Sequence, residues 1–225
     1  MILLAIDTST EIASLALFEN NNLLAEYCWQ VGQNHTVQLM PCLNALLEQT
    51  GIDIHSVRGI GIAVGPGSFN GLRVGIASAK GLALSLNVPI FGISTLEIAA
   101  YQVAFCGPPV CSMIKAGRGE IAVALYQKKD NCWQCLHKEY LTTLDLLSQT
   151  ITEPTIFTGE CVAEFGSELI ARLGDRAIIP PQSTLFRRAG FLAELALHRL
   201  EHGDEDNLTA LQPIYLRRPH ITQPK

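Results

Sequence analysis

The chain has 225 residues, of which 48% are hydrophobic and 16% charged, so it can bury a proper core and intrinsic disorder is excluded. Its 16 basic and 21 acidic residues give a formal net charge of −5, which disfavours direct binding of nucleic acid. No apolar run approaches the roughly 20 residues that span a bilayer, and the N-terminus lacks the basic region of a signal peptide. We therefore expect a cytoplasmic protein without membrane contact.

Hydrophobic periodicity predicts two halves with the same order of elements. In the first half we expect strands at 3–8, 13–19 and 23–30, a helix at 35–50 ending at Gly51, a strand at 59–65, a helix at 71–86, a strand at 88–94 and a helix at 95–105 capped by Thr95. In the second half we expect strands at 110–116, 120–127 and 133–141, a helix at 142–150, a strand at 155–160 and helices at 162–173 and 189–203. This repeat predicts an α/β protein with lobes at 1–104 and 105–225, the last helix packing back on the first lobe.

The glycine-rich stretch GPGSFNGLR, residues 65–73, joins a predicted strand to a predicted helix. Such a turn can bind phosphate through backbone N–H groups at the helix start. It lacks the lysine of a Walker A loop, and Asn70 stands where a dinucleotide-binding fingerprint has its third glycine. The turn is therefore either a weak nucleotide site or a tight corner.

A polar turn follows the first predicted strand, where Asp7 precedes Thr8, Ser9 and Thr10. It is similar to the turn that holds phosphate or its metal ion in actin-like kinases, although an aspartate closing a strand is also ordinary turn chemistry. The candidate nucleotide-binding residues, weak or shared with a partner, are Asp7, Thr8, Ser9, Thr10, Gly65, Gly67 and Ser68.

The helix after the glycine turn carries a stripe of small residues, because Gly71, Gly75, Ala79 and Ala83 recur at every fourth position. A stripe without large side chains lets another backbone approach closely. That neighbour is either the chain's own sheet or a helix of a partner.

Several stretches together resemble the bacterial TsaB (YeaZ) family: LLAIDTST, NHTVQLMPCLNALL, GIAVGPGSFNGLRVGIASAKGLA, GISTLEIAA, GRGEIAVALY and QPIYLRRP. The resemblance implies the two-lobed actin-like (ASKHA, RNase H-like) fold with two degenerate βββαβα halves. Members act with the related TsaD protein and the ATPase TsaE to place a threonylcarbamoyl group on the adenosine next to the anticodon of tRNAs that read ANN codons. TsaB is a catalytically degenerate relative that pairs with TsaD and can pair with itself, and it meets tRNA through the complex.

For this chain the resemblance implies no catalytic residue and no metal site, because His35 and His55 lack the histidine four positions on that TsaD-type enzymes have. ATP or ADP would bind in the complex rather than as an intrinsic cofactor. The implied partner interface consists of His35, Val37, Met40, Leu43, Leu47, Gly71, Arg73, Gly75, Ala79 and Ala83. A bulky residue at Gly75 or Ala79 is expected to abolish pairing with TsaD and leave the fold intact.

Two positions depart from the family pattern. Asn70 replaces the usual threonine of the glycine turn, and Lys115 begins a Lys-Ala-Gly stretch where relatives are acidic. The alternative function is an autonomous ATP-dependent kinase or ATPase that uses Asp7, Thr8 and the glycine turn.

Overall fold

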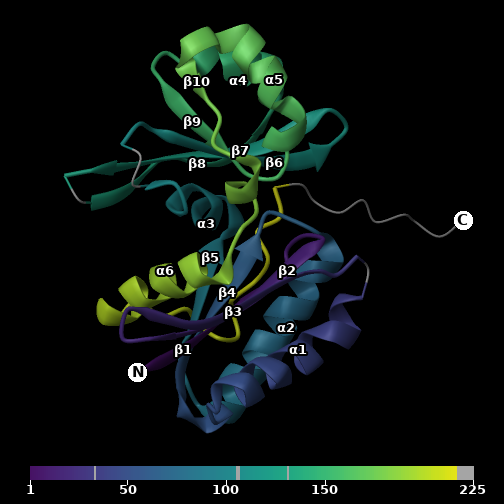
Figure 1. Ribbon diagram of the computed structural model, residues 1–225, viewed down its shortest axis with the longest axis vertical. Coiled ribbons are helices and arrows are strands. Elements are labelled where there is room, and N and C mark those ends of the chain that lie inside the picture. The colour runs from purple at the N-terminus through teal and green to yellow at the C-terminus, as the bar shows by residue number, and fades with distance from the viewer. Residues whose placement is uncertain (33, 105–106, 131, 217–225) are drawn as a thin grey trace, which may run out of the picture.

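Two five-stranded mixed sheets, one from each half of the chain, form the centres of two lobes (Figure 1). The structure is a computed structural model that describes residues 1–32, 34–104, 107–130 and 132–216. Within that part of the chain, no helix combines the length and the apolar character needed to cross a membrane.

The first sheet has the strand order β3-β2-β1-β4-β5, with β1 antiparallel to β2 and parallel to β4. Its lobe contains β1 (Ile2–Asp7), β2 (Ile12–Glu19), β3 (Asn22–Gln30), α1 (His35–Thr50), the 3-10 turn η1 (Ile54–Ser56), β4 (Val57–Gly65), α2 (Phe69–Leu86), β5 (Ile90–Ser94) and α3 (Thr95–Tyr101).

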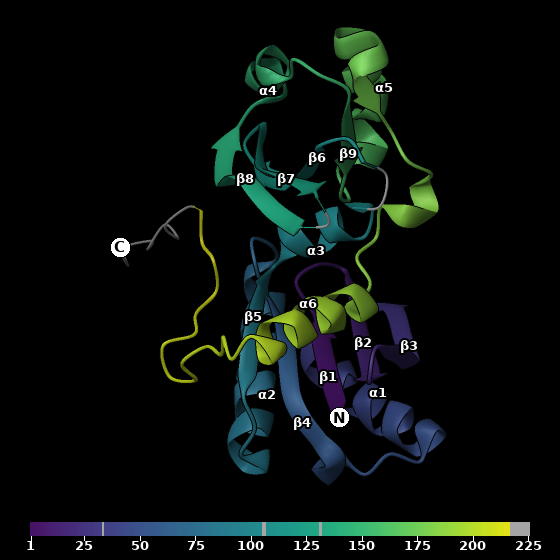
Figure 2. The same cartoon turned by 90° about the vertical axis from the view of Figure 1, so that its left-hand side faces the viewer.

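The second sheet has the order β10-β9-β6-β7-β8, so the order three strands, helix, strand, helix recurs. Its elements are β6 (Val110–Gly117), β7 (Glu120–Lys129), β8 (Cys132–Thr142), α4 (Leu144–Thr150), β9 (Thr155–Thr158), α5 (Val162–Leu173), the 3-10 turn η3 (Gly174–Arg176) and β10 (Ala177–Ile178). A second 3-10 turn, η4 (Gln182–Thr184), then leads to α6 (Ala189–Glu201), which packs on the first sheet (Figures 1 and 2).

The inner strands of each sheet are buried on both faces, which explains why they read as unbroken apolar runs. In β1, Leu4 and Ile6 belong to the core beneath α1 and α2, whereas Leu3 and Ala5 belong to the core beneath α6. In the second sheet one face packs against α4 and α5, and the other packs against α3. Helix α3 therefore lies between the lobes, as Figure 2 shows.

Most predicted elements are confirmed to within about two residues at each end. Helix α2 begins at Phe69 because the Ser68 side chain accepts a hydrogen bond from the Gly71 N–H and caps it. Helix α3 ends at Tyr101, earlier than predicted, and the predicted residue 105 lies outside the described residues. Thr95 does not cap α3, because its hydroxyl donates to the Pro66 carbonyl oxygen at 2.5 Å.

Candidate functional site: the cleft between the lobes

The glycine turn packs directly against the β1–β2 turn. A Cβ atom on Gly67 would lie 2.4 Å from the Ser9 carbonyl oxygen, and a Cβ atom on Gly71 would lie 2.0 Å from the Thr8 carbonyl oxygen. The Ser68 N–H donates to the Ser9 carbonyl oxygen at 2.7 Å, which fixes the contact. These glycines are thus required for two backbones to meet, a use that needs no phosphate.

Asp7, the carboxylate predicted to face phosphate or metal, is bound inside the protein. Its Oδ2 accepts from Arg187 Nε at 2.9 Å, and its Oδ1 accepts from the Ser9 N–H at 2.8 Å and from the Ser9 hydroxyl. Arg187 Nη2 donates to Ser9 Oγ at 2.8 Å, and Arg187 Nη1 lies 3.2 Å from Glu160 Oε1. Burial alone would lower the pKa of Arg187, but the carboxylates of Asp7 and Glu160 outweigh burial and raise that pKa.

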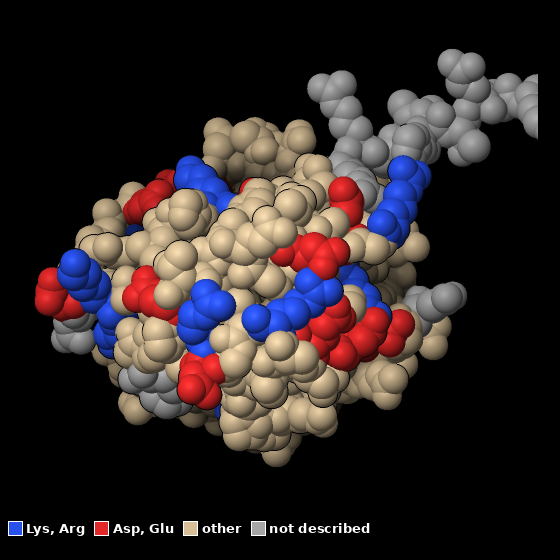
Figure 3. Space-filling model, turned by 90° about the horizontal axis from the view of Figure 1, so that it is seen from above, with Lys and Arg blue, Asp and Glu red and all other residues tan. Residues whose placement is uncertain are grey.

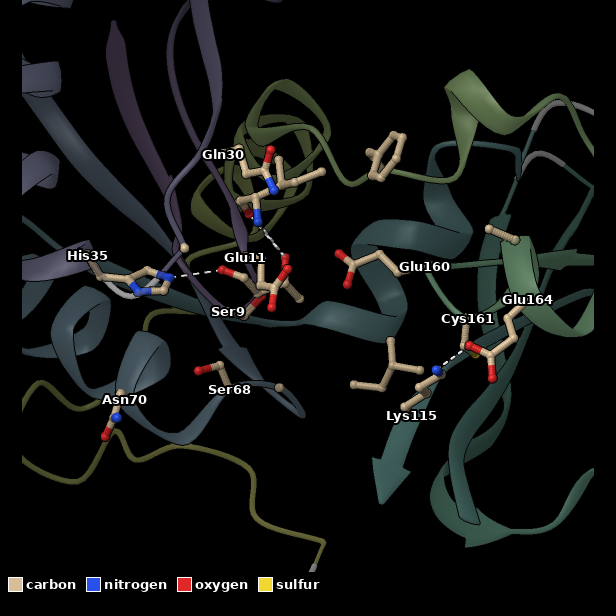
Figure 4. Close-up of a pocket in the computed structure, with 17 residues that line it drawn as sticks. Ser9, Glu11, Gln30, His35, Ser68, Asn70, Lys115, Glu160, Cys161 and Glu164 are labelled. Carbon is tan, nitrogen blue, oxygen red and sulfur yellow. Dashed lines mark hydrogen bonds and ion pairs between the residues drawn. The ribbon is translucent and has the colours of Figure 1, made fainter. Parts of the chain in front are cut away.

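A cavity of about 1050 Å³ opens beside this network, between the two lobes (Figure 4). Its lining comes from both lobes and consists of Ser9, Thr10, Glu11, Ile12, Gln30, Gly32, His35, Gly67, Ser68, Asn70, Ile114, Lys115, Glu160, Cys161, Ala163, Glu164 and Phe186. Figure 4 shows Glu160 reaching from the second lobe towards Ser9 and Glu11.

The charges that line this cavity are mainly acidic. Glu11, Glu160 and Glu164 contribute carboxylates, and the lining cation Lys115 forms an ion pair with Glu164. The His35 ring Nε2 lies 2.9 Å from the Thr10 carbonyl oxygen, so this nitrogen is engaged in holding the β1–β2 turn. Such a lining is a poor environment for a polyphosphate that arrives without cations.

The predicted nucleotide-binding residues divide into two groups. Ser9, Thr10, Gly67 and Ser68 line the cavity, whereas Asp7, Thr8 and Gly65 are not part of its lining among the described residues. The expectation that Asp7 faces an open phosphate site is wrong for this structure, because Arg187 covers its carboxylate. Nucleotide binding by the other residues stays a prediction.

The stripe of small residues on α2 faces the chain's own sheet. Gly71, Gly75, Ala79 and Ala83 are all buried, and a Cβ atom on Gly75 would lie 2.2 Å from Thr8 Oγ1. Their burial contradicts their expected contact with a partner, and we now expect a bulky residue at Gly75 or Ala79 to disturb the fold rather than leave it intact. The physical reason is that β1 and β4 take up the space that the stripe leaves free.

The remaining predicted interface residues are exposed to different extents. His35 and Leu43 are buried, Met40 and Leu47 are half-buried, and Val37 and Arg73 are exposed. Leu43 belongs to the core between α1 and the first sheet, whereas His35 is buried at the start of α1 by its contact with the β1–β2 turn. The burial of Leu43 in the core corrects its expected role as a partner contact, whereas a partner contact by His35, which lines the cavity, stays a prediction.

No group of three or more His, Cys, Asp or Glu side chains that could hold a metal ion occurs in the described part of the chain. His198 and His202 lie at the end of α6, where His202 Nδ1 bonds to the His198 carbonyl oxygen at 2.7 Å. This bond engages one ring nitrogen of His202 with the backbone at the end of the helix.

The upper face of the second lobe carries basic and acidic side chains side by side (Figure 3). On that lobe Arg172 pairs with Asp145 of α4 and with Glu168 of α5. The interspersed charges on this face do not form the basic footprint of a nucleic-acid-binding surface.

The sequence did not indicate the role of Arg187, which forms a buried ion pair with the Asp7 carboxylate and so makes that carboxylate inaccessible to a ligand. The pair Arg187–Arg188 before an apolar helix carries no local motif, and Asp7 lies 180 positions earlier. A buried arginine needs a buried carboxylate, but the sequence alone does not indicate which carboxylate that is.

Comparison with known proteins identifies the family. A family model described as tRNA N6-adenosine threonylcarbamoyltransferase (TsaD) matches residues 29–158, more than half of the chain. The chain is also 36% identical to the tRNA threonylcarbamoyladenosine biosynthesis protein TsaB of Bacillus subtilis (strain 168), over 96% of this chain and 94% of that protein. The chain belongs to the TsaB (YeaZ) family.

Further relatives agree with this family and its fold. The TsaB protein of Escherichia coli (strain K12) is 30% identical over 96% of this chain and 95% of its own length. A crystal structure from Pseudomonas aeruginosa, of a protein described as similar to peptidase YEAZ, superposes with a TM-score of 0.81 at 25% identity, covering 96% of this chain and 99% of that one.

The likeness extends to an actin-like ATPase-fold protein at the level of fold alone. The (R)-2-hydroxyglutaryl-CoA dehydratase component A of Acidaminococcus fermentans superposes with a TM-score of 0.55 at 12% identity, over 89% of this chain and 99% of that chain. The chain thus has the two-lobed ASKHA fold.

Proposed function

We propose that the chain is a non-catalytic cytoplasmic subunit that pairs with a TsaD-type protein. With a TsaE-type ATPase, the complex would place threonylcarbamoyl on the adenosine next to the anticodon of tRNAs that read ANN codons. The names of the relatives that match nearly the whole chain support a role in tRNA threonylcarbamoyladenosine biosynthesis. In this proposal ATP or ADP binds in the complex, and the tRNA is contacted through it.

The observation that carries the non-catalytic role is the state of Asp7. Phosphoryl transfer relies on metal ions or other cations placed against phosphate oxygens, and carboxylates commonly hold those metal ions. Here the Asp7 carboxylate already has an arginine and a serine hydroxyl as partners. An autonomous kinase or ATPase based on Asp7 is therefore disfavoured.

The outward faces of α1 and α2 are the surface we assign to the partner or to a second copy of the chain. Val37 of α1 is 73% exposed and Leu84 of α2 is 72% exposed, so both helices present apolar side chains that a partner could cover. We call the exposed set the α1–α2 surface; it comprises Val37, Pro41, Ala45, Arg73, Ala77, Gly81 and Leu84. On α2 it lies on the opposite side of the helix from the buried small-residue stripe.

The substitution Ala77→Arg tests this surface, because it places a long charged side chain on an exposed helical position without touching the core. We expect at least about tenfold weaker association with the TsaD-type protein, and a matching loss of threonylcarbamoylation of unmodified tRNA in the reconstituted system. Association is measured by titration calorimetry with purified proteins.

The matched control is Ala171→Arg on α5, an exposed helical alanine in the other lobe. It introduces the same side chain and should bind as the unchanged protein does. Equal affinities of the two variants for the TsaD-type protein, with unchanged melting temperatures, would show that α1 and α2 are not part of the interface.

A further inference from the structure

Arg187 connects the two lobes through oxygen atoms that come from both. It lies in the segment that runs from β10 in the second lobe to α6 on the first, and its side chain is 2% exposed. Its guanidinium contacts Asp7 Oδ2 at 2.9 Å and Ser9 Oγ at 2.8 Å in the first lobe, and lies 3.2 Å from Glu160 Oε1 in the second.

The oxygen atoms around the guanidinium are largely held by contacts that do not involve it. Asp7 Oδ1 accepts from the Ser9 N–H at 2.8 Å and from the Ser9 hydroxyl, so the β1–β2 turn fixes the carboxylate. The Ser68 N–H holds the same turn through the Ser9 carbonyl oxygen at 2.7 Å. Removing the arginine side chain would therefore leave a space bordered by the preformed Asp7 carboxylate and Ser9 hydroxyl, with the Glu160 carboxylate on its second-lobe side.

We propose that Arg187 is a built-in cation at an oxygen site between the lobes, and that the empty site of a variant without this side chain binds a small guanidinium ion. The acceptor oxygens explain the choice of cation. A planar guanidinium directs two N–H groups to Asp7 Oδ2 and Ser9 Oγ and places its charge 3.2 Å from Glu160 Oε1, whereas an ammonium is a compact point charge. By occupying the site, Arg187 both neutralises Asp7 and ties the β1–β2 turn to the β9–α5 turn.

The test is chemical rescue of Arg187→Ala, measured as the melting temperature of the purified chain. Loss of one partner of a buried ion pair leaves uncompensated charge, and we expect a fall on the order of 10 °C. Methylguanidinium chloride at on the order of 10 mM, far below denaturing concentrations, should restore much of this loss, because a ligand that binds only the folded state stabilises it by mass action. Methylammonium chloride and sodium chloride at the same concentration should not.

Two further variants make the result specific. Arg188→Ala removes the neighbouring arginine, whose ion pair with Glu26 is more exposed, and should show a smaller loss and no rescue. The double variant Asp7→Asn/Arg187→Ala keeps the space but loses the central carboxylate, so methylguanidinium should no longer raise its melting temperature. If Arg187→Ala is insoluble, the yield of soluble protein on refolding with and without methylguanidinium replaces the melting temperature as the readout.

Three outcomes would overturn the proposal. The first is an unchanged melting temperature of Arg187→Ala, and the second is equal rescue by methylammonium or sodium chloride. The third is equal rescue of the double variant, which would place the guanidinium elsewhere. These measurements use the isolated chain, so they succeed or fail independently of the proposed pairing with a TsaD-type protein.

Discussion

Single glycines of α2 differ in what they do, although they share one helix. Gly71 is buried against the Thr8 carbonyl oxygen, whereas Gly81 is exposed and a Cβ atom there would meet nothing within 4 Å. A glycine in a helix lowers stability relative to alanine, except where a Cβ atom would clash with a neighbour that lies very close to the helix backbone. The same substitution should therefore have opposite effects at the two positions.

Gly71→Ala should lower the free energy of unfolding by about 1–3 kcal/mol, because the new methyl group meets backbone that cannot rotate away. Gly81→Ala should raise it by about 0.5–1 kcal/mol, because it removes conformational freedom from the unfolded chain only. Urea denaturation of both variants checks the pair. A stabilising Gly71→Ala would contradict the close contact between α2 and the β1–β2 turn.

At the scale of elements, the segment after α6 shows how a region without regular structure is held in place. Its Ile214 N–H donates to the Val64 carbonyl oxygen at 2.7 Å, and Asp206 Oδ2 accepts from the Gly92 N–H at 2.7 Å and from Arg199 Nη1 at 2.8 Å. These bonds place the segment along β4 and β5, next to the glycine turn. The sequence here is proline-punctuated and predicts only the end of a helix.

Asp206→Ala should lower the free energy of unfolding by about 1–3 kcal/mol, because the partly buried Gly92 N–H loses its acceptor. Asp204 binds the same Arg199, at 2.9 Å to Nε, but its side chain is 66% exposed. Asp204→Ala should therefore change stability by less than about 1 kcal/mol. Guanidinium chloride denaturation of the two variants separates the roles, and equal losses would show that Asp206 does not anchor the segment.

At the scale of the whole molecule, α3 and β8 join the lobes through aromatic and ionisable side chains. Trp133 of β8 packs against Tyr101 of α3, and its Nε1 donates to Glu97 Oε1 at 3.2 Å. Burial raises the pKa of Glu97 and nearby Glu139 adds to this, while the Trp133 hydrogen bond and Arg199 oppose it. The junction between the lobes therefore contains a carboxyl group that the folded state prefers to protonate.

This shift has a defined sign in the pH dependence of stability. Because the folded-state pKa of Glu97 is above its ordinary value of 4.5, protonation of Glu97 favours folding as the pH falls, and its ionisation opposes folding at neutral pH. Glu97→Gln keeps an oxygen acceptor for Trp133 and removes the charge. The variant should be more stable than the unchanged chain at pH 7 by on the order of 1 kcal/mol, the usual scale for one buried polar group.

The advantage of Glu97→Gln should shrink as the pH is lowered towards 4.5, because the unchanged chain then becomes neutral at this position as well. Thermal unfolding of both proteins across this pH range provides the measurement. Glu153→Gln, at an exposed position, is the matched control. A pH-independent difference between Glu97→Gln and the unchanged chain would mean that Glu97 does not titrate differently on folding.

The sequence by itself determined the order of elements, the repeated halves and the family. All three follow from local signals in the sequence: the spacing of apolar residues, the positions of glycine and proline, and motifs such as GPGSFNGLR. Each of these signals lies within a short stretch of the chain. The two-residue strand β10 was missed because it is too short to have a period.

Only the tertiary structure decided what the site residues contact. A stripe of small residues predicts a close neighbour but does not identify it, and here the neighbour is the chain's own sheet rather than a partner. Likewise the turn that contains Asp7 is typical of a phosphate site, yet the Asp7 carboxylate forms an ion pair with Arg187, 180 positions away. Burial and ion pairing depend on both members of a contact, so a pair brought together by folding leaves no signal at either position alone.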